Sequence, residues 1–134
     1  MAGLRLLAVD DSPINLKILT TALGQVGHQV VATARTGAGA LVAYRQTQPD
    51  IVAMDIVMPD MDGIEATKQI LAEFPKAVIV MVTTVGRETM VAKALAAGAN
   101  GYIRHPLDHI ELAEVLNNSR RYRARMDRGN LVWD

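Results

Sequence analysis

The chain has 134 residues, of which 50% are hydrophobic and 4% aromatic, a size and composition typical of a single domain with an aliphatic core. It contains no Cys, which excludes disulfides, thiolate metal sites and a Cys nucleophile, and no apolar run approaches the ~20 residues of a membrane span. The net charge of zero gives no case for a nucleic-acid or membrane binder, and we expect a cytoplasmic protein. The charge is unevenly placed, however: residues 120–134 carry five basic and two acidic groups, whereas residues 1–119 carry nine basic and twelve acidic groups.

Apolar runs separated by amphipathic segments predict strands that alternate with helices. The first strand, over residues 4–9, ends in two Asp residues, and Ser12 followed by Pro13 is typical of a helix start. In the last helix, spacing places Ile110, Ala113 and Leu116 in the core. Further strands are predicted over residues 29–34, 51–54, 77–82 and 101–104, and further helices over residues 36–48, about 62–73, about 87–97 and from about 108 onward.

Five strands alternating with five helices predict an α/β fold, a doubly wound parallel sheet with helices on both faces and right-handed crossovers. No repeat, low-complexity segment or linker interrupts the first 119 residues. We therefore expect one domain over residues 1–119 and an Arg-rich extension over residues 120–134, made of a helix end and a tail.

Carboxylate and hydroxyl side chains follow three of the predicted strands: Asp10 and Asp11 the first, Asp55 the third, and Thr83 with Thr84 the fourth. The carboxyl ends of parallel strands meet at one edge of a sheet, where ligands bind. Carboxylates that converge there repel each other unless a cation offsets their charge, and oxygen ligands favour Mg²⁺. A carboxylate beside Mg²⁺ can attack phosphorus. Each residue alone is as well explained by a turn or helix cap, but the joint placement favours a site.

Four motifs occur along the chain: VDDS at residues 9–12, MDIVMPDMDG at 54–63, MVTT at 81–84 and AAGANGYIRHP at 96–106. In these motifs the chain resembles the receiver domain of two-component response regulators, the CheY-like family, over about residues 4–118. The resemblance implies a sheet with strand order 2-1-3-4-5 and a stand-alone response regulator in a phosphorelay, a signalling domain and not an enzyme. It also implies the partners: a histidine kinase or histidine phosphotransfer protein, a downstream target protein, and a second copy bound through the surface of the fourth helix, fifth strand and fifth helix.

The resemblance implies specific roles at the acidic edge. Asp55 would accept the phosphoryl group and bind Mg²⁺ together with the backbone carbonyl of Val57. Asp11 would bind the ion directly, and Asp10 largely through water.

A second set of implied roles concerns the response to phosphorylation. Thr83, with Thr84 beside it, would bind the phosphoryl group, and Tyr102 would swing inward behind it, which alters the nearby surface. The bond between His105 and Pro106 would be cis.

The sequence departs from the family at His105, where Lys normally precedes the Pro. His is shorter and loses its charge near neutral pH, and strand alternation points Arg104 to the other face of the sheet. We predict that Asp55 is still phosphorylated but that its coupling to the Thr83 and Tyr102 switch is altered; the alternative is that His105 only packs.

Two apolar residues, Val57 and Val85, stand where side chains flank the path of the hydrolytic water in the family. They can shield phosphorus but cannot orient water, so we predict slow dephosphorylation. Thr84 is bulkier than the Ala common at its position, which narrows access further.

The Arg cluster has two interpretations: solvated cations at a helix end, or an anion site with an interleaved Tyr. Some CheY-like proteins bind a cyclic dinucleotide through such a segment, so the resemblance implies that alternative ligand; nucleic acid is less favoured because no DNA-binding module follows. The cluster comprises Arg120, Arg121, Arg123 and Arg125.

Two competing functions remain open at this point. In a phosphorylation-independent binding module, His105 would mark a degraded site and the Arg cluster would hold an anion. A phosphatase-like enzyme also uses an Asp nucleophile, but it is disfavoured because Val57 occupies the position of the acid/base Asp.

Overall fold

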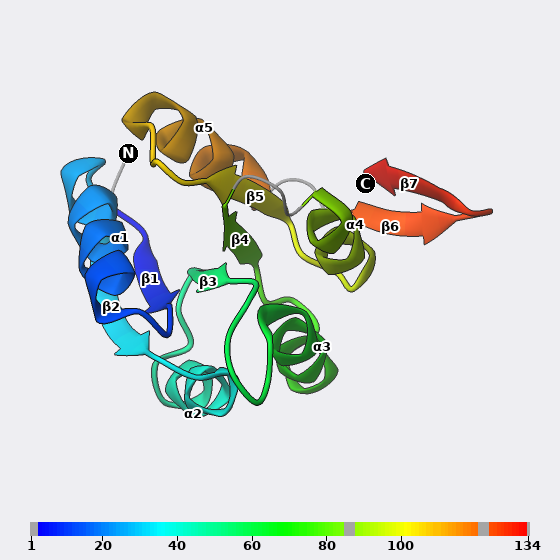
Figure 1. Cartoon of the computed structure of the whole chain (residues 1–134), viewed down its shortest axis with the longest axis horizontal. Helices are drawn as coiled ribbons and strands as arrows, with labels where there is room; N and C mark the ends of the chain where they lie inside the picture. Colours follow the sequence, from blue (N-terminus) through cyan, green and yellow to red (C-terminus); the bar gives the residue numbers. More distant parts are fainter. Residues whose placement is uncertain (1–2, 85–87, 121–123, 134) are drawn as a thin grey trace.

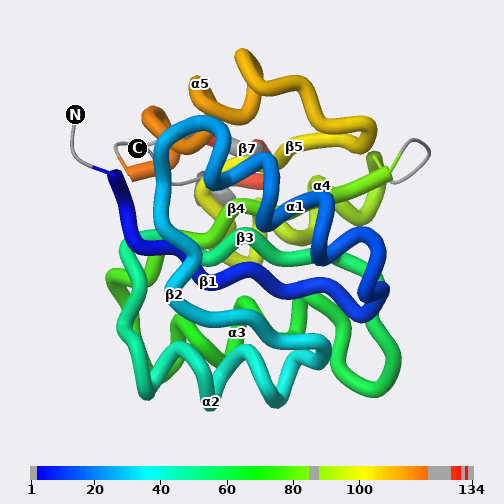
Figure 2. The backbone as a smooth tube through the Cα atoms, turned by 90° about the vertical axis from the view of Figure 1, so that its left-hand side faces the viewer, coloured from blue at the N-terminus to red at the C-terminus, as the bar shows by residue number. Residues whose placement is uncertain are grey.

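The computed structural model describes residues 3–84, 88–120 and 124–133. Within these residues, five strands form one parallel sheet in the order β2-β1-β3-β4-β5, which confirms the predicted fold class and strand order. Figure 2 shows the sheet between two layers of helices. The strands are β1 (Arg5–Val9), β2 (Gln29–Ala34), β3 (Ile51–Asp55), β4 (Ile79–Thr83) and β5 (Gly101–Arg104).

The helices between the strands cover both faces of the sheet, as a doubly wound fold requires. Their bounds are α1 (Pro13–Gln25), α2 (Gly37–Thr47), α3 (Gly63–Glu73), α4 (Glu88–Ala96) and α5 (His109–Ser119). Helices α1 and α5 lie on one face and α2, α3 and α4 on the other (Figure 1). No helix among the described residues is long and apolar enough to cross a membrane.

Side-chain caps fix where the helices α1 and α3 begin. The Ser12 hydroxyl accepts the amide of Asn15 at 3.3 Å, with Pro13 at the first helical position. The Asp62 carboxylate accepts the amide of Glu65 at 2.8 Å in the same way. Each cap satisfies an amide that the first turn leaves unpaired, so the chain turns back from the sheet edge at a defined residue.

Two aliphatic cores lie on the two faces of the sheet, one under α2, α3 and α4 and one under α1 and α5. The prediction for Ile110 is wrong, since this side chain is 75% exposed. Asp108 caps α5 through the amides of residues 110 and 111, and this start turns Leu112, Leu116 and Ser119 inward. Ile110 lies two residues before Leu112 and therefore faces solvent.

The C-terminal extension is not a helix end and tail. Helix α5 ends at Ser119, and an antiparallel hairpin follows, formed by β6 (Ala124–Asp127) and β7 (Asn130–Trp133). The two turn residues, Arg128 and Gly129, have φ of 53° and 80°, as a two-residue type I′ turn requires. A Gly interrupts any helix here, and the following Leu-Val-Trp run favours a strand, so the hairpin is the better local solution.

Candidate functional site

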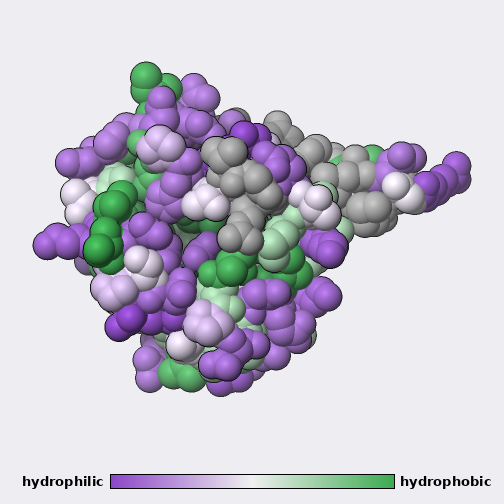
Figure 3. Space-filling model, in the orientation of Figure 1, coloured by the Kyte–Doolittle hydropathy of each residue, from purple (hydrophilic) through white to green (hydrophobic). Residues whose placement is uncertain are grey.

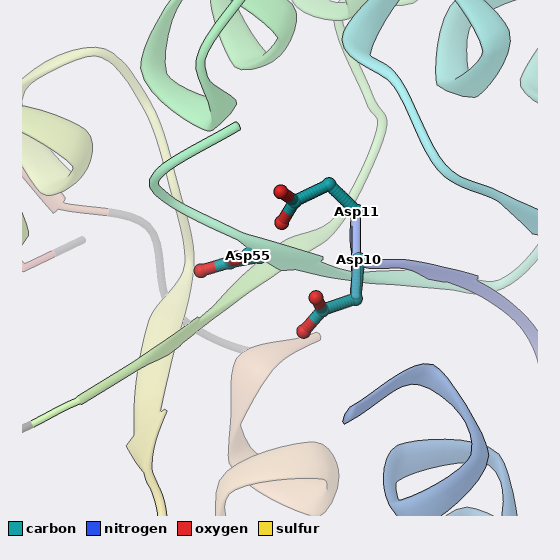
Figure 4. Close-up of side chains that lie close together, drawn as sticks. All are labelled: Asp10, Asp11 and Asp55. Carbon is teal, nitrogen blue, oxygen red and sulfur yellow. The ribbon is translucent and has the colours of Figure 1, made fainter. Parts of the chain in front are cut away.

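Three carboxylates meet at the carboxyl edge of the sheet. β1 and β3 are neighbours, and their register pairs Val9 with Met54, so the next residues, Asp10 and Asp55, leave the sheet at one level. Asp11 follows Asp10, and each of the three side chains offers an oxygen within 4.8 Å of the others. Figure 4 shows the three carboxylates projecting into a shared space beyond the strand ends. The predicted convergence is therefore present.

Backbone groups hold two of these carboxylates in place. Asp10 is buried, and its Oδ1 accepts the amide of Ser12 at 2.9 Å while its own amide donates to Ala34 at 3.1 Å. Oδ1 of Asp55 accepts the amide of Val57 at a longer 3.4 Å. The turn after each strand thus supplies the donor that orients the carboxylate preceding it.

Gly63 is a site residue that the sequence marked only as the last residue of the motif over residues 54–63. Its amide donates to the carbonyl of Ile56 at 2.6 Å, and its backbone lies so close to Asp55 that an added Cβ would collide with the Asp55 carbonyl oxygen. The helix start is therefore packed directly against the strand end that carries Asp55. Only a residue without a side chain allows this approach, and the sequence signal for it is a Gly immediately after the Asp62 cap.

Burial and mutual repulsion make the cluster unfavourable when fully ionised. Burial first, then the charges of Asp10 and Asp11, raise the pKa of Asp55 from 3.8 to about 7, against the lowering effect of the Val57 amide. Burial likewise raises the pKa of Asp10, opposed by the Ser12 amide. Near neutral pH the cluster thus holds a proton or requires a cation.

The donor set fits a hard divalent cation. All three side chains offer oxygen ligands; Asp10 is buried, and Asp11 and Asp55 are half-buried. A divalent cation offsets their combined negative charge.

A small cavity of about 140 Å³ opens beside Asp55. Thr83 and Thr84, from the end of β4, line it together with Ile56 and Val57. Thr83 is 3% exposed, and its hydroxyl donates to the carbonyl of Thr84 at 3.3 Å, a long bond that a better acceptor in the cavity could replace. The structure therefore brings Thr83 and Asp55 to one cavity, as predicted.

His105 and Arg104 lie on opposite faces of the sheet, as strand alternation predicts. The His105 amide donates to the carbonyl of Thr83 at 2.8 Å, and its ring is close enough to Asp10 to lower the pKa of that carboxyl. Arg104 lines a cavity on the α4 side with Thr83 and Tyr102. The peptide bond between His105 and Pro106 is cis, which confirms that prediction.

Some of the residues predicted to have a role lie outside the residues that the structure describes. Arg121, Arg123 and Val85 lie outside the described residues, and Arg125 lies on β6. Arg120 caps the end of α5 and is exposed. The anion site of the Arg cluster and the role of Val85 stay predictions.

Comparison with known proteins places the chain among signalling domains. The sequence profile described as "Response regulator receiver domain" matches residues 6–117. The chain is 37% identical to the chemotaxis protein CheY of Thermotoga maritima over 115 residues, covering 86% of this chain and 96% of that protein. It is 40% identical to the protein PilH of Pseudomonas aeruginosa, covering 84% of this chain and 94% of that protein.

Solved structures agree with this placement. The CheX-CheY-BeF₃-Mg²⁺ complex of Borrelia burgdorferi contains a chain that matches with a TM-score of 0.79 and 32% identity, covering 86% of this chain and 87% of that one. A two-component response regulator of the LuxR family from Aurantimonas matches with a TM-score of 0.81 and 35% identity, covering 87% and 84%.

Proposed function

The chain belongs to the response regulator receiver domain family, a CheY-like domain of two-component signalling, and we propose that Asp55 is its phosphoacceptor. One observation carries the proposal. Asp55 is the residue that lies both in the carboxylate cluster with Asp10 and Asp11 and on the wall of the cavity shared with Thr83. A phosphoryl group on Asp55 would therefore have a cation site on one side and a hydroxyl donor on the other.

The proposed reaction transfers a phosphoryl group from a phosphohistidine. An Asp55 carboxylate oxygen attacks phosphorus, the P–N bond breaks, and its electron pair returns to the imidazole nitrogen, which takes up a proton. Asp10, Asp11, Asp55 and the Val57 carbonyl would hold Mg²⁺, and the bound ion would neutralise charge on the phosphoryl group. Thr83 would donate its hydroxyl to one phosphoryl oxygen in place of the Thr84 carbonyl.

The phosphodonor has a suitable surface next to this site. Ile14 and Ile18 of α1 are 73% and 47% exposed, and they line a groove of about 870 Å³ that reaches His105 and Leu107. Figure 3 shows apolar patches over α1 and at the start of α5, and others near the middle and the lower edge of the same view. We propose that a histidine-phosphorylated protein docks here. Ile14→Ser with Ile18→Ser should slow transfer from such a protein without affecting labelling by acetyl phosphate. Val42→Ser on α2, which is about as exposed as Ile18, should change neither.

His105 takes the place of the usual Lys in this proposal. Its position on the same face as Asp10 lets it lie near the phosphoryl group, but with a shorter reach than Lys. We propose that phosphorylation occurs and that its coupling to the Thr83 and Tyr102 switch is altered.

The competing functions have less support. The family match and the complete acidic cluster both favour a phosphoacceptor over a phosphorylation-independent module. The phosphatase-like alternative lacks an acid/base carboxylate at Val57. A cyclic dinucleotide at the Arg cluster, a target protein and a second copy on the surface of α4, β5 and α5 stay predictions.

Acetyl phosphate labelling tests the proposal directly. The protein should gain one phosphoryl group in the presence of Mg²⁺, detected by intact mass, and Asp55→Asn should gain none. Asp60→Asn is a matched control, because Asp60 is an exposed carboxylate in the same loop whose φ of 67° Asn tolerates. Labelling of Asp55→Asn at the same rate as the unmodified protein would overturn the assignment.

A further inference from the structure

The C-terminal hairpin is the part of the molecule that the receiver function leaves unexplained. Its strands β6 and β7 form a sheet of their own, beyond the residues that match the family. β6 lies against α4, and Figure 1 shows the hairpin running outward past that helix. Because an isolated two-stranded hairpin is at best marginally stable in water, we infer that contact with α4 stabilises it.

Helix α4 also lines a cavity of about 180 Å³. Val91 and Leu95 of α4 form one wall, and Thr83, Tyr102 and Arg104 form the other. A water molecule occupies ~30 Å³ in the liquid, so this space has room for a side chain to move. Tyr102 is half-buried beside it.

Helix α4 therefore borders both this cavity and the hairpin. It is 9 residues long, and it contacts β4, α3 and β6. If Thr83 or Tyr102 moves into the cavity and displaces α4, the contact between α4 and β6 must change with it.

We propose that the hairpin is a built-in cover for α4 that stabilises the unphosphorylated arrangement, and that phosphorylation of Asp55 loosens it. This inference rests on the proposed function of Asp55. Linkage makes the coupling reciprocal: whatever loosens the hairpin raises the affinity of the site for a phosphoryl group or its mimic by the same factor. A protein that binds the hairpin in its loosened state would thereby favour the phosphorylated form.

The chain carries its own probe, because its single Trp is Trp133 on β7. Beryllofluoride with Mg²⁺ serves as the phosphoryl mimic, and its binding is followed by the rise in melting temperature. Binding should change Trp133 emission and increase amide exchange across residues 124–133, with no change in Asp55→Asn. Gly129→Val, which places a β-branched residue at φ of 80°, should open the hairpin and tighten beryllofluoride binding by at least about fivefold.

A control variant separates turn geometry from charge. Arg128→Gly keeps a turn that tolerates positive φ and removes one cation, and it should leave beryllofluoride affinity within about twofold. Two results would refute the proposal that the hairpin stabilises the unphosphorylated arrangement, while leaving Asp55 as phosphoacceptor. One is beryllofluoride binding without any change in amide exchange at residues 124–133, and the other is an unchanged beryllofluoride affinity in Gly129→Val. Absence of beryllofluoride binding would overturn both proposals.

Discussion

Replacing Asp55 by Asn should stabilise the metal-free protein at alkaline pH. The pKa of Asp55 is raised from 3.8 to about 7, chiefly by burial and then by the charge of Asp10. Between these two values the folded state holds a proton that the unfolded chain has released, so stability falls as pH rises through this window. A rise of about three pKa units at 1.36 kcal/mol each corresponds to about 4 kcal/mol above pH ~7.

The Asn side chain is nearly isosteric with Asp but carries no charge, so it removes this cost. With EDTA present at about pH 8, Asp55→Asn should unfold at a higher urea concentration than the unmodified protein, and its free energy of unfolding should be larger by up to about 4 kcal/mol. At about pH 4 the two proteins should unfold at nearly the same urea concentration. Excess Mg²⁺ should reduce the difference, because a bound cation offsets the same repulsion.

Urea titrations followed by far-UV circular dichroism across this pH range measure the effect. Asp60→Asn, an exposed carboxylate in the loop after β3, should follow the unmodified protein within about 0.5 kcal/mol at every pH. A stability difference between Asp55→Asn and the unmodified protein that does not vary with pH, or an unmodified protein that is the more stable at about pH 8, would refute the reasoning.

Four further outcomes follow from the site. Calorimetry should show Mg²⁺ affinity falling by up to about tenfold per pH unit below pH ~7, with proton release, because the ion displaces the proton on Asp55; affinity independent of pH would contradict this. His105→Lys should leave the yield of acetyl phosphate labelling unchanged but alter the phosphoryl lifetime and the amide exchange around Tyr102; identical behaviour in both would assign His105 to packing. Val57→Asn, at a 39% exposed position on the cavity wall, should speed loss of the phosphoryl group by about tenfold if it orients water, as measured by the decay of intact mass. Gly63→Ala should destabilise the protein by about 1–3 kcal/mol in urea titrations, because the added Cβ collides with the Asp55 backbone. The control Gly24→Ala should not destabilise the protein, because an added Cβ there has open space around it.

Strand ends and caps could be predicted from the sequence because their causes are local. An apolar run followed by Asp-Asp-Ser-Pro defines the end of β1 and the start of α1, and the cap at Ser12 forms as expected. Burial within α5 could not be predicted this way. The phase of that helix depends on which amides Asp108 caps, so Ile110 faces solvent although steps of three residues lead from it through Ala113 to Leu116.

The extension shows the same limit for a whole element. Helix continuation and a hairpin are both compatible with RRYRAR, and the positive φ of Arg128 and Gly129 is what distinguishes them. The sequence feature that favours a hairpin is a Gly shortly before a Leu-Val-Trp run. A hairpin is stable only with a surface to pack against, and α4 provides that surface in the fold.

The sequence by itself determined the chemistry of this protein: which residues carry carboxylates and hydroxyls, that each follows a strand, and that His105 replaces the usual Lys. Alternation of strands and helices then required those residues to share one edge. Only the tertiary structure decided their distances, the burial that raises the pKa of Asp55, and the close approach of Gly63, because these depend on the register between β1 and β3 and on the loop that packs against them. It likewise decided that β6 lies against α4, since nothing local to either segment specifies a contact between residues so far apart in the chain.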